Sequence, residues 1–183
     1  MDYAGFDEVF ALVLSAPTRD PAASQPARLK SLFHELALAE PPRSADDIEE
    51  LIWALWISHP DATTAGAMNA AAQAMASGRF GIAGPVLDVL THDHPEWSEA
   101  WNKRATLAFI QKRDSAALAD IARTLALEPR HFGAIAGFGQ ICLRHERKQE
   151  ARAAFQVALA INPHLQGLSE LIADLARETA RSH

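Results

Sequence analysis

The sequence predicts an all-α fold, a right-handed superhelix built from stacked pairs of helices. Three prolines, Pro95, Pro129 and Pro163, follow one another at a spacing of 34 residues (129 − 95 and 163 − 129), and each closes an alanine-rich run with helical periodicity. A fixed period in this range is typical of repeat proteins, in which each unit buries its apolar face against the next. Cutting the chain at this period places small or apolar residues in register. They are Ala71, Ala105 and Gly139; Ala83, Ala117 and Ala151; and Leu87, Ile121 and Phe155.

Composition supports one continuous solenoid and excludes some partners. The 183 residues are 49% hydrophobic, which is ample for a core that runs through the whole stack. The formal net charge is −6 and the isoelectric point is about 5.7. This balance disfavours nucleic acid and anionic membrane surfaces as partners, and it accommodates a cationic or neutral partner more easily.

The hydropathy and charge pattern of the sequence does not predict a membrane span or a secretory signal. No window reaches the roughly 18 to 20 consecutive apolar residues of a membrane span. The first apolar run, Val9 to Leu14, follows acidic residues with no Lys or Arg before it, whereas a secretory signal has the opposite charge. We therefore expect no membrane span and a cytoplasmic location, or a periplasmic one if a signal peptide has been removed.

The first segment, residues 1–26, is predicted to be an N-terminal helix and a linker. The helix covers Tyr3 to Ser15, and the proline-containing stretch from Pro17 to Pro26 then breaks the pattern. Its apolar face is continuous, so we expect the helix to cap the solenoid; an arm that binds a partner or mediates self-association is the alternative. The apolar positions are Phe6, Val9, Phe10, Val13 and Leu14.

Residues 27–63 are predicted to form a degenerate helical repeat ahead of the regular ones. One helix spans about 27–39 and ends at Pro41-Pro42. The next begins after Ser44, an N-cap residue followed by acidic residues that suit the positive end of a helix dipole, and it ends at His59-Pro60. Its two tryptophans, Trp53 and Trp56, are expected to join this unit to the first regular repeat.

Three regular helix pairs follow, and a last helix closes the stack. The units are residues 64–97, 98–131 and 132–165, with helices at about 63–77 and 80–93, 97–111 and 114–127, and 131–145 and 148–161. The hinge of the first pair contains Gly78, which can take the left-handed conformation that ends a helix. Residues 166–183 form an amphipathic capping helix, without which the last repeat would expose its apolar face.

The 34-residue unit resembles the tetratricopeptide repeat, whose pattern runs Trp, Leu-Gly, Tyr, Ala, Phe, Ala, Pro. The match is strongest from Glu99-Ala-Trp-Asn-Lys-Arg-Ala-Thr to Leu127-Glu-Pro, and again from Gly139 through Ala151 and Phe155 to Pro163. The chain is similar to small bacterial tetratricopeptide proteins of unassigned role. The resemblance implies a non-enzymatic adaptor for protein–protein interaction, with no cofactor.

The resemblance also implies where a partner binds, because the first helix of each pair lines the concave side in this family. The residues expected in a groove for a peptide or helix of a partner protein are Met68, Asn69, Asn102, Lys103, Thr106, Phe109, Gln140 and Arg144. Alternatively, some of these face a terminal helix and belong to the core. Only Lys103 is cationic among the five places where chaperone-binding members grip a carboxylate, so a chaperone tail is not expected.

Other functions have weaker support. A closed apolar pocket at Met68, Met75 and Phe109 would make the chain a small-molecule or lipid-binding solenoid, and this is the main alternative. Cys142 and His145 lie three residues apart but lack an orienting group or an oxyanion hole, so we expect a buried, inert thiol and no enzyme. His92-Asp-His94 lacks further ligands at a recognised spacing, so no metal site is expected.

Overall fold

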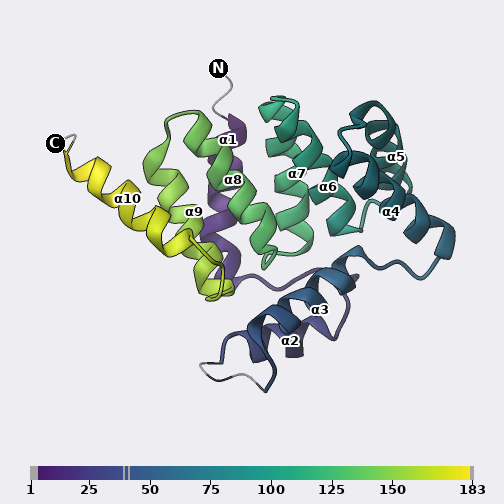
Figure 1. Ribbon diagram of the computed structural model, residues 1–183, viewed down its shortest axis with the longest axis horizontal. Coiled ribbons are helices and arrows are strands. Elements are labelled where there is room, and N and C mark those ends of the chain that lie inside the picture. Colours follow the sequence, from purple (N-terminus) through teal and green to yellow (C-terminus); the bar gives the residue numbers. More distant parts are fainter. Residues whose placement is uncertain (1–3, 39, 41, 182–183) are drawn as a thin grey trace.

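The computed structural model describes residues 4–38, 40 and 42–181, and the side chains of all of these except 4 and 179–181. Within these residues it contains ten α-helices and one short 3-10 helix, Ala16–Thr18, and no strand (Figure 1). Three predicted helix boundaries, Tyr3, Ala39 and Pro41, lie outside the described residues. The helices are α1 (Ala4–Ser15), α2 (Leu29–Leu36), α3 (Ala45–Ile57), α4 (Ala62–Ala76), α5 (Phe80–Asp93), α6 (Ser98–Ile110), α7 (Asp114–Leu127), α8 (Phe132–Arg144), α9 (Lys148–Ile161) and α10 (Leu168–Arg181).

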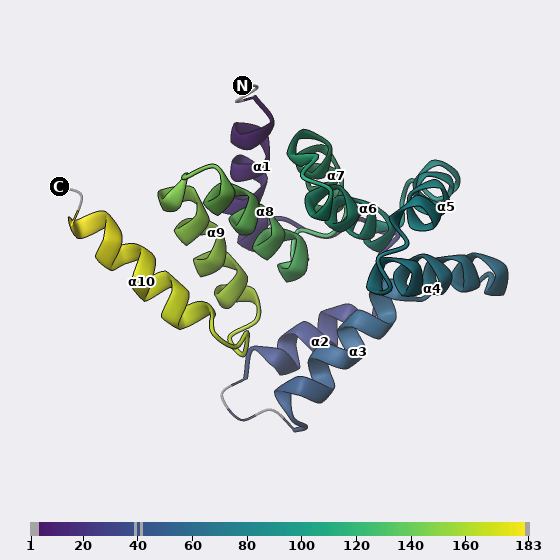
Figure 2. The same ribbon diagram turned by 45° about the horizontal axis from the view of Figure 1, so that its top comes forward.

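The predicted all-α solenoid is confirmed. The pairs α4/α5, α6/α7 and α8/α9 follow one another along a curved stack that α10 continues (Figure 2), and each of these six helices begins and ends within one residue of its predicted bounds. The in-register small residues mark the close approaches between helices. At Gly139 an added Cβ would lie 2.4 Å from Cε1 of Phe155, so α8 and α9 could not approach this closely around a larger residue.

All three pairs turn through the same helix-ending motif. The second residue after each first helix has a left-handed backbone: Gly78 (φ 70°), Lys112 (φ 58°) and Glu146 (φ 60°). The next residue donates its N–H back five residues, as in Arg79 to Ala74 O at 2.8 Å. This is the Schellman motif, which satisfies the carbonyls that the end of a helix leaves free.

The N-terminal helix does not cap an end of the stack as expected. Helix α1 lies against α7 and α9, in the middle of the chain's regular region (Figures 1 and 2). Val9 and Val13 are fully buried there and Phe6 nearly so, within one core cluster that contains Leu118 of α7 and Phe155 of α9. Burial on this scale contributes on the order of 1.5–3 kcal/mol for each large side chain. Most of the apolar face that could have mediated self-association is therefore used within the chain, whereas Leu14 is exposed.

Helix α1 occupies the groove between α7 and α9 and not the equivalent groove between α5 and α7. The residues at two repeat positions explain this choice. In the groove between α5 and α7, Arg104 donates two hydrogen bonds to Asp120, each 2.8 Å long, and a third to Thr91. One period later the same two places hold Phe138 and Ala154, which are fully buried beside α1. Phe138 contacts the rings of Phe6 and Phe10, each at 6.3 Å between centroids. Charged side chains line one groove, which stays open as a hollow of about 310 Å³, whereas an apolar floor accepts a helix in the other.

The linker after α1 is hydrogen-bonded along the loops of the stack. The N–H of Ala22 donates to the carbonyl oxygen of Leu127 at 2.8 Å, and the Ser98 hydroxyl donates to the Gln25 side chain at 3.1 Å. These bonds lead the chain past the ends of α7 and α6 to the start of α2.

The α2–α3 hairpin was predicted to stack ahead of the first regular pair, and this is wrong. It lies across the ends of several pairs and contacts the same place in three successive units. Trp97 donates its indole N–H to Trp56 O at 2.7 Å, the His131 ring stacks on the Trp56 ring at 4.0 Å, and Leu165 packs against the hairpin's core cluster. Trp56 therefore joins the hairpin to the end of the first regular unit, as expected, and also to the end of the second, because these loops present side chains to the hairpin every 34 residues.

The hinges give a stability prediction. Lys112→Gly and Glu146→Gly should each stabilise the protein by about 0.5–1 kcal/mol, because a residue with a Cβ is strained in the left-handed region and glycine is not. Chemical denaturation would measure this, with Lys112→Ala and Glu146→Ala as matched controls that keep the Cβ. Equal stability of the glycine and alanine variants would contradict the assigned strain.

Candidate functional site

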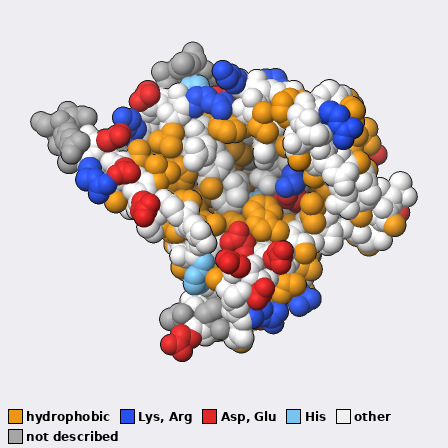
Figure 3. Space-filling view, viewed as in Figure 1, with side chains coloured by type: hydrophobic (Ala, Val, Ile, Leu, Met, Phe, Trp, Pro, Cys, Tyr) orange, Lys and Arg blue, Asp and Glu red, His pale blue; other side chains and the backbone are white. Residues whose placement is uncertain are grey.

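A small groove opens between α6 and α8 on the face shown in Figure 3, where a hollow is visible near the centre. Its volume is about 110 Å³. Ile121 of α7 lines the groove and also belongs to the core cluster that contains α1. The lining residues are Asn102, Ala105, Thr106, Phe109, Ile121, Gly133, Ala134, Gly137, Gln140 and Ile141.

Four of the eight residues expected in the groove line this hollow: Asn102, Thr106, Phe109 and Gln140. Thr106 and Gln140 are exposed, Phe109 is half-buried and Asn102 is buried. The Asn102 amide donates to Glu99 at 2.9 Å, so this side chain also has a role inside the protein. Glycine at 133 and 137 leaves the α8 side of the groove without bulk.

The other four expected residues do not line it. Met68 is fully buried in a separate cluster of α4, α5 and α6, so its assignment to a groove was wrong. Asn69 is exposed on α4, away from the hollow. Lys103 and Arg144 flank the groove and are both paired: Lys103 with Glu99 at 2.9 Å, and Arg144 with Asp114 at 2.5 Å. Arg144 also covers the Phe109 ring at 3.9 Å.

A buried polar network supports the α3 side of the groove. Glu99 is fully buried, and one of its carboxylate oxygens lies 2.9 Å from both Nε2 of His131 and the Asn102 amide nitrogen. Nδ1 of His131 accepts the N–H of Ala134 at 3.2 Å and so caps α8, which places the ring proton on Nε2, where it is donated to Glu99. Nothing in the sequence shows that these side chains meet.

The pKa of Glu99 is lowered from its ordinary value by this network. Burial is the largest influence and raises the pKa. The hydrogen bond from His131 and the electrostatic interactions with His131 and the Lys103 ammonium together lower the pKa by more than burial raises it. The ionised Glu99 therefore links Lys103 of α6 to His131 at the start of α8.

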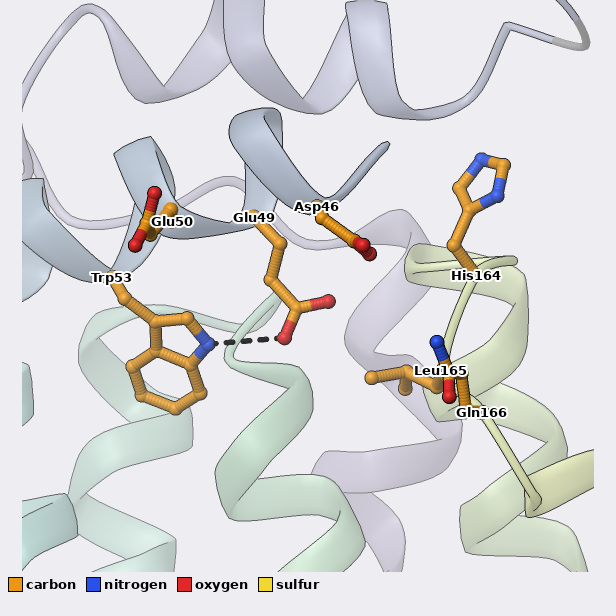
Figure 4. Close-up of a pocket in the computed structure, with 7 residues that line it drawn as sticks. All are labelled: Asp46, Glu49, Glu50, Trp53, His164, Leu165 and Gln166. Carbon is orange, nitrogen blue, oxygen red and sulfur yellow. Dashed lines mark hydrogen bonds between the residues drawn. The ribbon is translucent and has the colours of Figure 1, made fainter. Parts of the chain in front are cut away.

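A second hollow of about 350 Å³ lies between α3 and the loop that precedes α10 (Figure 4). Three of its side chains are acidic. Figure 4 shows the Trp53 indole N–H donating to Glu49 at 3.3 Å, and the other Glu49 oxygen accepts from the Asn162 amide at 2.8 Å. This α3 pocket was not predicted, because α3 was expected at one end of the stack. Its lining residues are Asp46, Glu49, Glu50, Trp53, His164, Leu165 and Gln166.

The residues considered for catalysis or metal binding do not form such sites in the described part of the chain. Burial raises the pKa of the Cys142 thiol to about 12, and the nearby His145 instead places Nε2 2.8 Å from Asp114. A thiol with this pKa is not a nucleophile at neutral pH. In the described part of the chain there is no cluster of three or more His, Cys, Asp or Glu side chains suited to a metal ion. No helix in the same residues has the length and apolar content to cross a membrane.

Comparison with known proteins identifies one relative over most of the chain. The chain is 32% identical over 162 residues to a TPR repeat-containing protein of Rhizobium etli, and the aligned region covers 88% of this chain and 79% of that protein. No family model and no solved structure matches the chain.

The buried network predicts a specific pH dependence. Glu99→Gln should destabilise the protein by about 1–3 kcal/mol at neutral pH, because a buried hydrogen-bonded charge is removed. Since the folded pKa of Glu99 is lowered, its stabilisation is complete above the ordinary value of 4.5 and is lost as pH falls through the folded pKa.

Urea denaturation of wild type and Glu99→Gln at neutral and acidic pH measures this effect. The other carboxylates are the same in both proteins, so their contribution to the pH dependence cancels in the difference. The stability difference between wild type and Glu99→Gln should narrow below pH 4.5. A difference that stays constant across this range would show that folding does not lower the pKa of Glu99.

Proposed function

Because the chain belongs to the tetratricopeptide repeat family, we propose that it is a non-enzymatic scaffold that binds a peptide or helix of a partner protein in the groove between α6 and α8. The observation that carries the proposal is that the chain leaves this groove unfilled. Helix α1 and the α2–α3 hairpin bury their apolar faces elsewhere, against α7, α9 and the loops. In the alternative, a terminal helix covers the groove residues. The N-terminal helix α1 instead lies in another groove, between α7 and α9.

The chemistry of the groove suits a peptide. Exposed Thr106 and Gln140 offer hydrogen-bonding groups to a backbone, and Phe109, Ile121 and Ile141 provide an apolar floor for a side chain. A volume of about 110 Å³ accommodates one side chain. Sites for whole small molecules are usually about 300–1,000 Å³.

The small-molecule alternative loses its structural basis. It required Met68, Met75 and Phe109 to enclose one apolar pocket. Met68 and Met75 instead belong to the cluster of α4, α5 and α6, whereas Phe109 packs against the cluster that contains α1. A peptide-binding scaffold is therefore the function that the geometry favours.

Filling the groove should abolish partner binding. At Gly137 an added Cβ would meet only Ile121 Cδ1 at 3.9 Å, so a Cβ fits at this position, and Gly137→Leu adds its side chain at the lining of the hollow. Gly66→Leu on α4 is the matched control, because nothing lies within 4 Å of its added Cβ. Both variants should melt within a few degrees of wild type, since leucine favours helices over glycine.

Affinity capture from a lysate of the native cells, with mass spectrometry as the readout, would test the proposal. A protein recovered by wild type and Gly66→Leu but lost with Gly137→Leu is the expected result. Recovery of the same proteins by all three would place the binding site elsewhere. A small molecule that co-purifies with wild type and is seen by native mass spectrometry would favour the alternative.

A further inference from the structure

The groove and the α3 pocket share a wall. Trp53 lines the α3 pocket, and an added Cβ at Gly133 would lie 2.6 Å from Cη2 of Trp53, so the indole rests directly on the α8 backbone there. Gly133 in turn lines the groove between α6 and α8. Figure 3 shows acidic side chains gathered over α3 at the edge of the hollow. The two hollows are therefore neighbouring parts of one surface.

Charge along this surface is uneven. At the groove, the cations Lys103 and Arg144 are each within 3 Å of a carboxylate of this chain. At the α3 pocket, no Lys or Arg of the described residues forms an ion pair with Asp46, Glu49 or Glu50. The hydrogen-bond donors to Glu49 are the neutral side chains Trp53 and Asn162. No Lys or Arg of the described residues therefore neutralises the carboxylates of this pocket, whose lining also includes His164.

The helix dipole accounts for only part of this charge. Asp46 and Asp47 lie in the first turn of α3, where a carboxylate is stabilised by the positive end of the helix. Glu49 and Glu50 lie beyond that turn, and the effect decays within it. Helix stability alone therefore does not require carboxylates at these two places.

We propose that the partner segment is a cationic peptide: an apolar side chain occupies the groove between α6 and α8, and neighbouring Lys or Arg side chains of the same segment occupy the α3 pocket. The carboxylates of Asp46, Glu49 and Glu50, which line the pocket, pair with these cations. The net charge of −6 attracts such a segment over longer distances. This inference rests on the function proposed above and adds the chemistry of the partner.

Selection of short random peptides displayed on phage against the wild-type protein would provide probes. Affinities of the enriched peptides are then measured by fluorescence anisotropy with three variants: Gly137→Leu, the charge reversal Asp46→Lys/Glu50→Lys, and a control reversal Glu8→Lys/Asp93→Lys. Both reversals change the net charge equally, and all four side chains are exposed. Glu49 is retained so that its bond to Asn162 stays intact, and melting curves verify the fold of each variant.

The enriched peptides should combine an apolar residue with neighbouring Lys or Arg. The reversal at α3 should weaken their binding about tenfold or more, whereas the control reversal should change it far less, because complementary charges act over short distances. Raising the salt from about 0.1 M to about 1 M should remove most of the difference, because the Debye length falls from about 10 Å to about 3 Å.

The variants separate this inference from the function on which it rests. Peptides that lose affinity for Gly137→Leu but not for the α3 reversal would leave the groove as the binding site and overturn the cationic partner. Peptides unaffected by Gly137→Leu would overturn both. Equal losses with the two charge reversals would also contradict the inference, because attraction would then depend on net charge alone.

Discussion

The imidazole of His131 is the point on which the rest of the structure depends. One ring nitrogen caps α8, the other donates to the buried Glu99 of α6, and the ring face stacks on Trp56 of α3. Three elements far apart in the sequence are thereby held in one geometry. A buried carboxylate is costly unless its hydrogen bonds are made, so this arrangement is tolerated only when all three are in place. It sets the separation of α6 and α8, and with it the groove.

The extra helices determine which surface stays open. A regular stack of helix pairs leaves grooves on both sides, and this chain covers them unequally. Helix α1 fills the groove between α7 and α9, and the α2–α3 hairpin covers the loops. Between α5 and α7 the Arg104–Asp120 pair lines a hollow of about 310 Å³ that stays open. The side between α6 and α8 also remains uncovered, and Gly133 and Gly137 line the hollow there. The open groove follows from where the other apolar faces are buried.

Much of the fold, and half of the expected groove residues, could be predicted from the sequence. The 34-residue period located six helices within one residue, and the position of the first helix of each pair identified Asn102, Thr106, Phe109 and Gln140. Met68 was misplaced because an apolar residue at helical spacing is compatible with either a groove or a core. The α3 pocket was missed because its walls, Glu49 and His164, are separated by more than a hundred residues and follow no period.

The sequence by itself determined much of the local structure: the helix that begins after its N-cap Ser44, the left-handed hinge at Gly78, and small residues where helices cross. These features depend on neighbours within a few residues or one repeat, so the pattern carries them. Only the tertiary structure decided where α1 and the hairpin dock, because an amphipathic face shows that a helix is buried but not against what. The docking of α3 in turn placed Trp53 on Gly133 and created an acidic surface beside the groove.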